Sequence, residues 1–102
     1  MHAHIRPDGD GIRVSGEMTV YAARALKQPL LEAFAGGARH LDLSEVSEFD
    51  TAGLQLLLLA HRESAAAGRE LGLVSPSNIV RETLALAGCE YLLARRAGER
   101  TL

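Results

Sequence analysis

Residues 41–60 read Leu41-Asp-Leu-Ser-Glu-Val-Ser-Glu-Phe-Asp-Thr-Ala-Gly-Leu-Gln-Leu-Leu-Leu-Leu-Ala60. This pattern predicts a buried strand, an acidic loop over residues 44–50 and a helix that begins near Thr51. The backbone N–H groups at such a helix start have no intrahelical partner, and the helix dipole favours negative charge there. Gly53 lies in the first helical turn although glycine lowers helix propensity. The sequence therefore indicates that this helix end is modified or binds a partner.

The bulk composition favours one soluble domain spanning residues 1–102. Hydrophobic residues make up 47% of the chain and charged residues 24%, with a net charge of −2. This charge balance does not indicate a basic surface that would bind nucleic acid or an anionic membrane. The longest apolar run, residues 56–60, is far too short to span a bilayer, and no signal peptide is recognisable. A single cysteine, Cys89, excludes an internal disulfide and fits a reducing compartment, so a cytosolic protein is expected.

On both sides of residues 41–60 the chain alternates strands with helices. A hairpin is predicted over residues 3–14, around the turn Asp8-Gly9-Asp10-Gly11. Thr19 is the expected N-cap of the first helix, and Pro29 is expected to kink or split that helix. The further predicted elements are the first helix over 20–35, a strand over 38–43, the second helix over 51–67 ending at Gly68, a strand over 70–74, the third helix from Ser75-Pro76 to Ala87, and a short last element near 92–93. The order ββαβαβα predicts an α/β fold with a small mixed or parallel sheet and helices packed against it.

Leucines occupy more than one face of the second helix. At about 100° per residue one face is expected to pack on the sheet: Leu54, Leu57, Leu58, His61 and Ala65. Gln55 and Arg62 mark the solvent side, flanked by Ala52, Leu56 and Leu59. Leu59 is expected to be largely exposed, which suggests partner contact. In the third helix the residues expected to face inward are Ile79, Thr83 and Leu86, with Val80, Leu84 and Ala87 beside them.

Catalytic and metal-binding patterns are missing from the sequence. The four histidines lack metal-ligand spacing, and neither a phosphate-binding glycine loop nor a Gly-x-Ser-x-Gly nucleophile occurs. His61 is interpreted as a core or boundary residue, and Cys89 as a small buried hydrophobe. The expectation is therefore a protein without enzymatic activity, metal or cofactor.

Thr51 is the one candidate reactive group, and two interpretations are open. It or Asp50 can simply cap the helix, which is stabilising by about 1 kcal/mol. Alternatively Thr51 accepts a phosphoryl group, which would meet free N–H groups and a favourable dipole. A phosphate would add up to about two negative charges beside Glu45, Glu48 and Asp50, and so would repel an acidic partner.

These residues resemble the STAS family, the fold of bacterial anti-sigma factor antagonists. The family pattern is a strand ending in Asp-Leu-Ser, then an Asp-Ser/Thr-x-Gly-Leu segment opening a helix; here it stands as Leu41-Asp-Leu-Ser44 and Asp50-Thr51-Ala52-Gly53-Leu54. Gly16-Glu17 and Leu73-Val-Ser-Pro-Ser77 resemble two further family segments. The resemblance covers a core of about residues 11–93.

The resemblance implies a binding switch. In antagonists the hydroxyl after the aspartate, here Thr51, is phosphorylated by a serine/threonine kinase that is often itself the anti-sigma factor, and phosphorylation releases this partner. The residues expected to contact the partner are Asp50, Ala52, Gly53, Gln55, Leu56, Leu59 and Arg62.

Two departures from the antagonist pattern keep other roles open. Threonine replaces the usual serine, and the next hydroxyl is lost as Ala52. Similar Asp-Thr segments occur in the small cytoplasmic subunit of lipid-transport ABC complexes, where this helix end contacts the ATPase. They also occur in STAS proteins associated with chemotaxis-type signalling.

Overall fold

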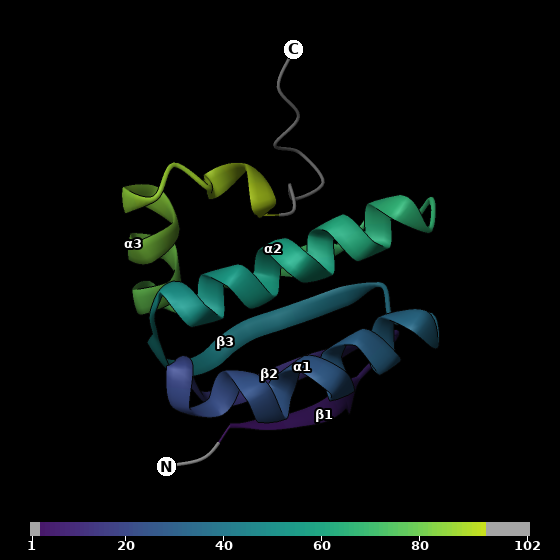
Figure 1. Cartoon of the computed structure of the whole chain (residues 1–102), viewed down its shortest axis with the longest axis horizontal. Coiled ribbons are helices and arrows are strands. Elements are labelled where there is room, and N and C mark those ends of the chain that lie inside the picture. Colours follow the sequence, from purple (N-terminus) through teal and green to yellow (C-terminus); the bar gives the residue numbers. More distant parts are fainter. Residues whose placement is uncertain (1–2, 94–102) are drawn as a thin grey trace.

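A computed structural model describes residues 3–93, and Figure 1 shows the arrangement of its elements. The elements are β1 (His4–Asp8), β2 (Gly11–Met18), α1 (Val20–Ala35), β3 (His40–Phe49), α2 (Thr51–Ala66), β4 (Gly72–Val74), α3 (Asn78–Leu86) and the 3-10 helix η1 (Glu90–Leu92). The α/β class and the order ββαβαβα are therefore confirmed. Helix α1 runs through Pro29 as one element, so the split considered from the sequence does not occur.

The four strands form one mixed sheet in the order β1-β2-β3-β4. β1 and β2 are antiparallel and joined by a two-residue turn, where Gly9 adopts a left-handed φ of 63°. The pairs β2–β3 and β3–β4 are parallel. Because both crossovers step in the same direction across the sheet, right-handed connections place their helices on one face. Figure 1 shows α1 and α2 together on that side of the sheet.

β3 is longer than the sequence pattern indicated. Residues 44–49 continue the strand, so the expected acidic loop over 44–50 is wrong. The reason is that β2 extends to Met18 and pairs with β3 as far as Phe49, with two register shifts on the way. Val46 and Phe49 point into the core, whereas the polar residues between them are exposed. The chain therefore enters α2 directly from a strand end.

The buried face of α2 differs from the expected one by about one residue of helical rotation. It consists of Gly53, Leu56, Leu57, Ala60 and Ser64. Leu56, expected near solvent, is in the core, and Leu59 is half-buried instead of largely exposed. The pattern misled because α2 has apolar neighbours on two flanks as well as beneath it. Its flank facing η1 carries His61, a boundary residue as expected, whose ring meets Tyr91 edge-on at 6.3 Å.

Helix α3 also differs from the sequence expectation at its start and its face. It begins at Asn78 after the N-cap residue Ser77, not at Ser75, because Ser75 adopts a left-handed φ of 51° and turns the chain first. The buried residues are Val80 and Leu84. Leu86, expected to point inward, is 92% exposed. Cys89 is only half-buried, packed against the core edge. The arginine-rich end of the chain lies outside the described residues.

The sheet face opposite the helices carries an ion-pair network. Arg6, Arg13 and Asp42 occupy one row across β1, β2 and β3. Arg13 lies 3.2 Å from Glu45, 3.5 Å from Asp8 and 3.6 Å from Asp42. Burial alone would raise the pKa of Asp42, but hydrogen bonds from the Ser44 hydroxyl and N–H, with Arg13 and His40 nearby, hold that pKa below its ordinary value of 3.8.

This lowered pKa makes the domain sensitive to acid. A carboxyl group whose folded pKa is depressed contributes stability above its unfolded pKa, and this contribution is lost as the pH falls through the folded value. We expect the free energy of unfolding to fall below about pH 4, and Asp42→Asn to weaken this pH dependence. Urea unfolding at a series of pH values measures both, with the exposed Glu82→Gln as a control. The expectation is contradicted if the free energy of unfolding falls as steeply with acidification in Asp42→Asn as in the wild type.

Candidate functional site at the N-terminal end of α2

The Asp50 carboxylate joins the starts of two helices. Its Oδ1 accepts hydrogen bonds from the N–H groups of Ala52 at 2.9 Å and Gly53 at 3.3 Å, as an N-cap of α2. Its Oδ2 accepts a third bond from the N–H of Val20, the first residue of α1, at 3.1 Å. The N-cap residue of α1, Thr19, makes no side-chain capping bond. One side chain thus satisfies orphan donors of both helices.

Gly53 is explained by close packing. A Cβ atom at this position would clash with the Met18 carbonyl oxygen and would lie 2.8 Å from the Phe49 ring. The first turn of α2 therefore rests directly on the ends of β2 and β3, and only glycine leaves the necessary room. The glycine does not by itself indicate modification or docking, contrary to the interpretation drawn from the sequence.

Thr51 is exposed at the first position of α2, and its hydroxyl makes no hydrogen bond within residues 3–93. A phosphate here was expected to meet free N–H groups. This expectation is wrong, because the N–H groups of the next three residues already have acceptors. The N–H groups of Ala52 and Gly53 donate to the Asp50 carboxylate, and that of Leu54 donates to the Asp50 carbonyl at 3.0 Å. A phosphate on Thr51 would therefore lie beside an occupied cap and a negative carboxylate.

The residues expected to contact a partner divide into three groups by exposure. Gln55 and Arg62 are exposed, like Thr51, whereas Asp50, Ala52 and Leu59 are half-buried. Gly53 and Leu56 are buried. At about 100° per residue, Thr51, Gln55, Leu59 and Arg62 lie on one side of α2. We call these four residues the α2 stripe.

Sequence reasoning missed an apolar patch beside this site. Val20, the first residue of α1, is 62% exposed, and Tyr21 is 92% exposed. Both adjoin the site because Asp50 holds the Val20 N–H. The four-residue spacing of Leu26, Leu30 and Phe34, the buried residues of α1, could have revealed that Tyr21 points away from the core.

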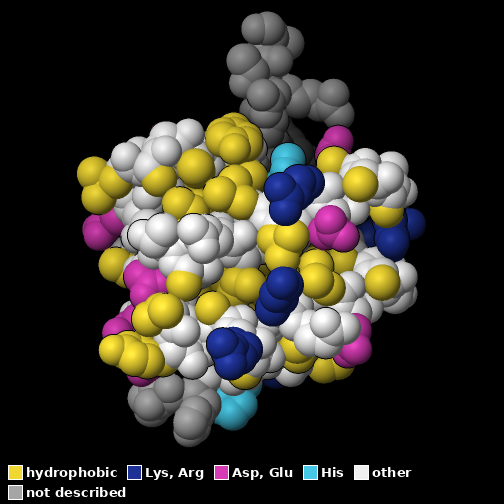
Figure 2. Space-filling view, viewed as in Figure 1, with side chains coloured by type: hydrophobic (Ala, Val, Ile, Leu, Met, Phe, Trp, Pro, Cys, Tyr) yellow, Lys and Arg dark blue, Asp and Glu magenta, His cyan; other side chains and the backbone are white. Residues whose placement is uncertain are grey.

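Acidic side chains accompany the apolar patch. Glu17 and Glu48 are direct partners across β2 and β3, and Glu48 is exposed one residue before the end of β3. Figure 2 shows hydrophobic and acidic side chains interspersed along the edge of the molecule where α1 and α2 begin, on the left of the view. This edge thus combines apolar contact area with negative charge.

Within residues 3–93 no three histidine, cysteine or acidic side chains are grouped so that they could hold a metal ion. None of the helices in this part of the chain combines the length and the apolar character needed to cross a membrane.

Comparison with known proteins identifies the family of this chain. The family model described as "Mlab, STAS domain" matches residues 1–94. The chain belongs to the STAS domain family. No curated protein matched it in a sequence search.

Solved structures share the STAS fold with this domain. The anti-sigma factor antagonist SpoIIAA in its unphosphorylated form is 22% identical, with a TM-score of 0.70 over 95% of this chain and 90% of that one. The Bacillus cell fate determinant SpoIIAA in the phosphorylated form is 19% identical, with a TM-score of 0.64 over 95% of this chain and 93% of that one. A structure described as Mglu is 24% identical, with a TM-score of 0.55 over 74% of this chain but only 20% of its own.

Proposed function

We propose that this STAS domain is a non-enzymatic binding switch of the anti-sigma factor antagonist type, acting in the cytoplasm without a cofactor. A protein partner, either a serine/threonine kinase or an anti-sigma factor, docks on the α2 stripe and the adjoining edge. Phosphorylation of Thr51 releases it. The observation that carries this proposal is the exposed hydroxyl of Thr51, the first residue of α2. Thr51 directly follows Asp50, whose carboxylate accepts hydrogen bonds from the first turns of both α1 and α2. SpoIIAA, with the same fold, has been solved in unphosphorylated and phosphorylated forms.

The geometry supports release and not recruitment on phosphorylation. The γ-phosphoryl group of ATP would pass to Thr51 Oγ1, which loses its proton, and ADP would leave. The new phosphate would carry up to about two negative charges at neutral pH. Because Asp50 already occupies the nearest N–H groups, the helix start offers little compensation. The phosphate would instead be repelled by Asp50 and would need water where the unmodified surface packs against a partner.

A test of the switch is Thr51→Glu, which places negative charge at the exposed first position of α2. We expect affinity for the kinase that co-purifies from native cells to fall by about tenfold or more, with an unchanged melting temperature. Phosphopeptide mapping of the native protein should find phosphate on Thr51. Gln28→Glu is the matched control, because Gln28 is exposed in the second half of α1, outside both the α2 stripe and the adjoining edge. Equal affinities for Thr51→Glu and wild type would refute the switch.

A second candidate function has one observation in its favour. The family model that matches is described as "Mlab, STAS domain". As the resemblance of the Asp-Thr segment also suggests, the domain would then be a constitutive accessory subunit whose α2 stripe contacts the ATPase of a lipid-transport ABC complex. Stoichiometric co-purification with such an ATPase, together with unphosphorylated Thr51, would favour this role over the switch. A chemotaxis-type partner would be recognised in the same experiment.

A further inference from the structure

The N-terminal parts of α1 and α2 carry a charge that differs in sign from that of the chain. Residues 20–31 and 51–62 contain Arg24, Lys27 and Arg62 but no acidic residue, so their formal net charge is +3. The net charge of the whole chain is −2. The overall charge balance therefore conceals a local excess of positive charge on these two helices.

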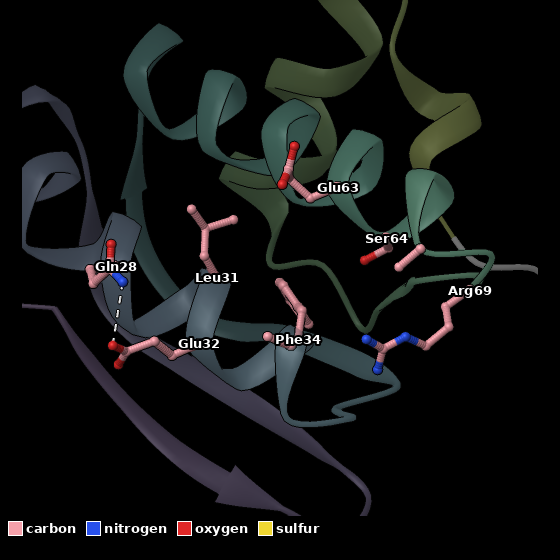
Figure 3. Close-up of a pocket in the computed structure, with 9 residues that line it drawn as sticks. Gln28, Leu31, Glu32, Phe34, Glu63, Ser64 and Arg69 are labelled. Atoms are coloured by element: carbon pink, nitrogen blue, oxygen red, sulfur yellow. Dashed lines mark hydrogen bonds between the residues drawn. The ribbon is translucent and has the colours of Figure 1, made fainter.

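Arg24 and Lys27 lie on the side of α1 that faces α2. Leu31 marks this side, because it lines a hollow of about 350 Å³ that is bordered by both helices. Figure 3 shows its side chain directed from α1 toward α2. Lys27 precedes Leu31 by four residues and Arg24 precedes it by seven, and these spacings keep side chains on one side of a helix. Both cations therefore border α2.

Leu59 and Arg62 continue this surface on α2. His61 marks the flank of α2 toward η1, where its ring meets Tyr91. Leu59 lies about 160° around the helix from His61 and therefore borders α1, which packs on the other flank. Arg62 follows Leu59 by three residues and is exposed. Figure 2 shows Lys and Arg side chains in a row across α1 and α2, with hydrophobic side chains beside them. We call five residues the basic face: Arg24, Lys27, Leu31, Leu59 and Arg62.

The cations of the basic face have no counter-charge in the domain. Arg24, Lys27 and Arg62 are exposed and form no ion pair within residues 3–93. By contrast, both arginines of the opposite sheet face are paired with a carboxylate. Leu31 and Leu59 are half-buried beside the unpaired cations. This combination is complementary to a surface that presents carboxylates around apolar side chains.

We propose that the basic face docks an acidic amphipathic segment of a protein partner. The carboxylates of the segment pair with the three cations, and its apolar side chains pack on the two leucines. The inference rests on the proposed function, because Leu59 and Arg62 also belong to the α2 stripe, and it names the chemistry of the partner that the switch releases. A phosphate on Thr51 would add up to about two negative charges and so reduce the net charge of +3 to about +1. The attraction for an acidic segment would weaken accordingly.

The test is a titration of the full chain with a synthetic acidic peptide, followed by amide chemical shifts in NMR spectra. The peptide has about 16 residues, which form about 24 Å of helix, with leucine at every third or fourth position and glutamate at the others. We expect a dissociation constant of about 10–100 μM at low salt, with the largest shifts in residues 24–31 and 55–62. Binding should be at least about fivefold weaker at about 0.3 M salt. The same peptide with lysine in place of glutamate should not bind.

Variants identify the groups responsible. The double variant Arg24→Gln/Lys27→Gln should bind the acidic peptide about fivefold more weakly and with a smaller salt dependence, because two of the three ion pairs are lost. Its melting temperature should be unchanged, because both side chains are exposed. Arg81→Gln is the matched control, because Arg81 is an exposed cation on α3, outside the basic face.

The proposal is overturned by no detectable binding of the acidic peptide, by equal binding of the lysine peptide, by shifts confined to other parts of the domain, or by an affinity that the double variant leaves unchanged. Binding to anionic phosphatidylglycerol vesicles without binding to the peptide would also overturn it and would assign the face to a membrane surface. Weaker binding in the double variant with unchanged binding in Thr51→Glu would support the basic face and count against the switch, so the two proposals fail separately.

Discussion

Gly53→Ala is expected to destabilise the domain by about 2 kcal/mol or more, which corresponds to a fall in melting temperature of about 10 °C. Alanine has the higher intrinsic helix propensity, by up to about 1 kcal/mol, so propensity alone would give the opposite sign. The added Cβ would meet the Met18 carbonyl oxygen and the Phe49 ring. The carbonyl belongs to the last residue of β2, so α2 could make room only by moving away from the sheet.

Gly36→Ala is the matched control, since Gly36 ends α1 with an ordinary φ of −80°. The nearest atom to its added Cβ would be the Glu32 carbonyl oxygen at 3.3 Å, a contact that small shifts relieve. Its effect should stay within about 1 kcal/mol. Thermal and urea unfolding of both variants provide the comparison. A Gly53→Ala protein as stable as Gly36→Ala would show that α2 does not rest on β2 as described.

Gly53 also illustrates what the sequence could and could not reveal. The segment Asp50-Thr51-Ala52-Gly53-Leu54 located the helix start correctly, because capping and helix propensity are local properties. The reason for the glycine is not local: it lies in Met18, 35 positions earlier in the chain. Local reasoning therefore found an anomaly and assigned it to modification or docking, when tertiary packing was responsible.

The orientation of α2 shows the same limit. Its boundaries followed from the sequence, but its buried face did not, because leucines occur around most of the helix. A periodicity argument needs one polar side and one apolar side. α2 instead has α1 on one flank and η1 on another, so Leu56 and Leu59 could be assigned to core or solvent only with the neighbours in place. For β3, the pairing partner extended the strand beyond its apolar pattern.

Asp50→Ala is the second variant for which we expect a large effect. It removes the acceptor for three backbone N–H groups, two in α2 and one in α1. Loss of one N-cap costs about 0.5–2 kcal/mol, so loss of a cap shared by two helices should cost about 2–3 kcal/mol. Asp50→Asn should cost less, because its amide oxygen can still cap α2. Its NH₂ group, however, would face the Val20 N–H donor.

The contribution of the α1 bond can be isolated with Val20→Pro. Proline is well suited to the first position of a helix, and it lacks the N–H that donates to Asp50. Thr19, which would precede it, already has the extended backbone that a following proline requires, with φ −123° and ψ 176°. In the wild-type background Val20→Pro should lower the free energy of unfolding by about 1 kcal/mol, because the hydrogen bond to the charged carboxylate is lost. The rigid proline ring offsets part of this loss by restricting the unfolded chain.

In the Asp50→Ala background the same Val20→Pro change should cost nothing or should stabilise, because no carboxylate remains to lose. The double-mutant cycle from urea unfolding therefore gives the coupling between the starts of α1 and α2, expected at about 1 kcal/mol. A coupling of this size would mean that any event at Asp50 is felt by both helices. A phosphate on Thr51 that displaces the carboxylate would then disturb the exposed Val20–Tyr21 patch as well as the α2 stripe. A coupling near zero would confine its effect to α2.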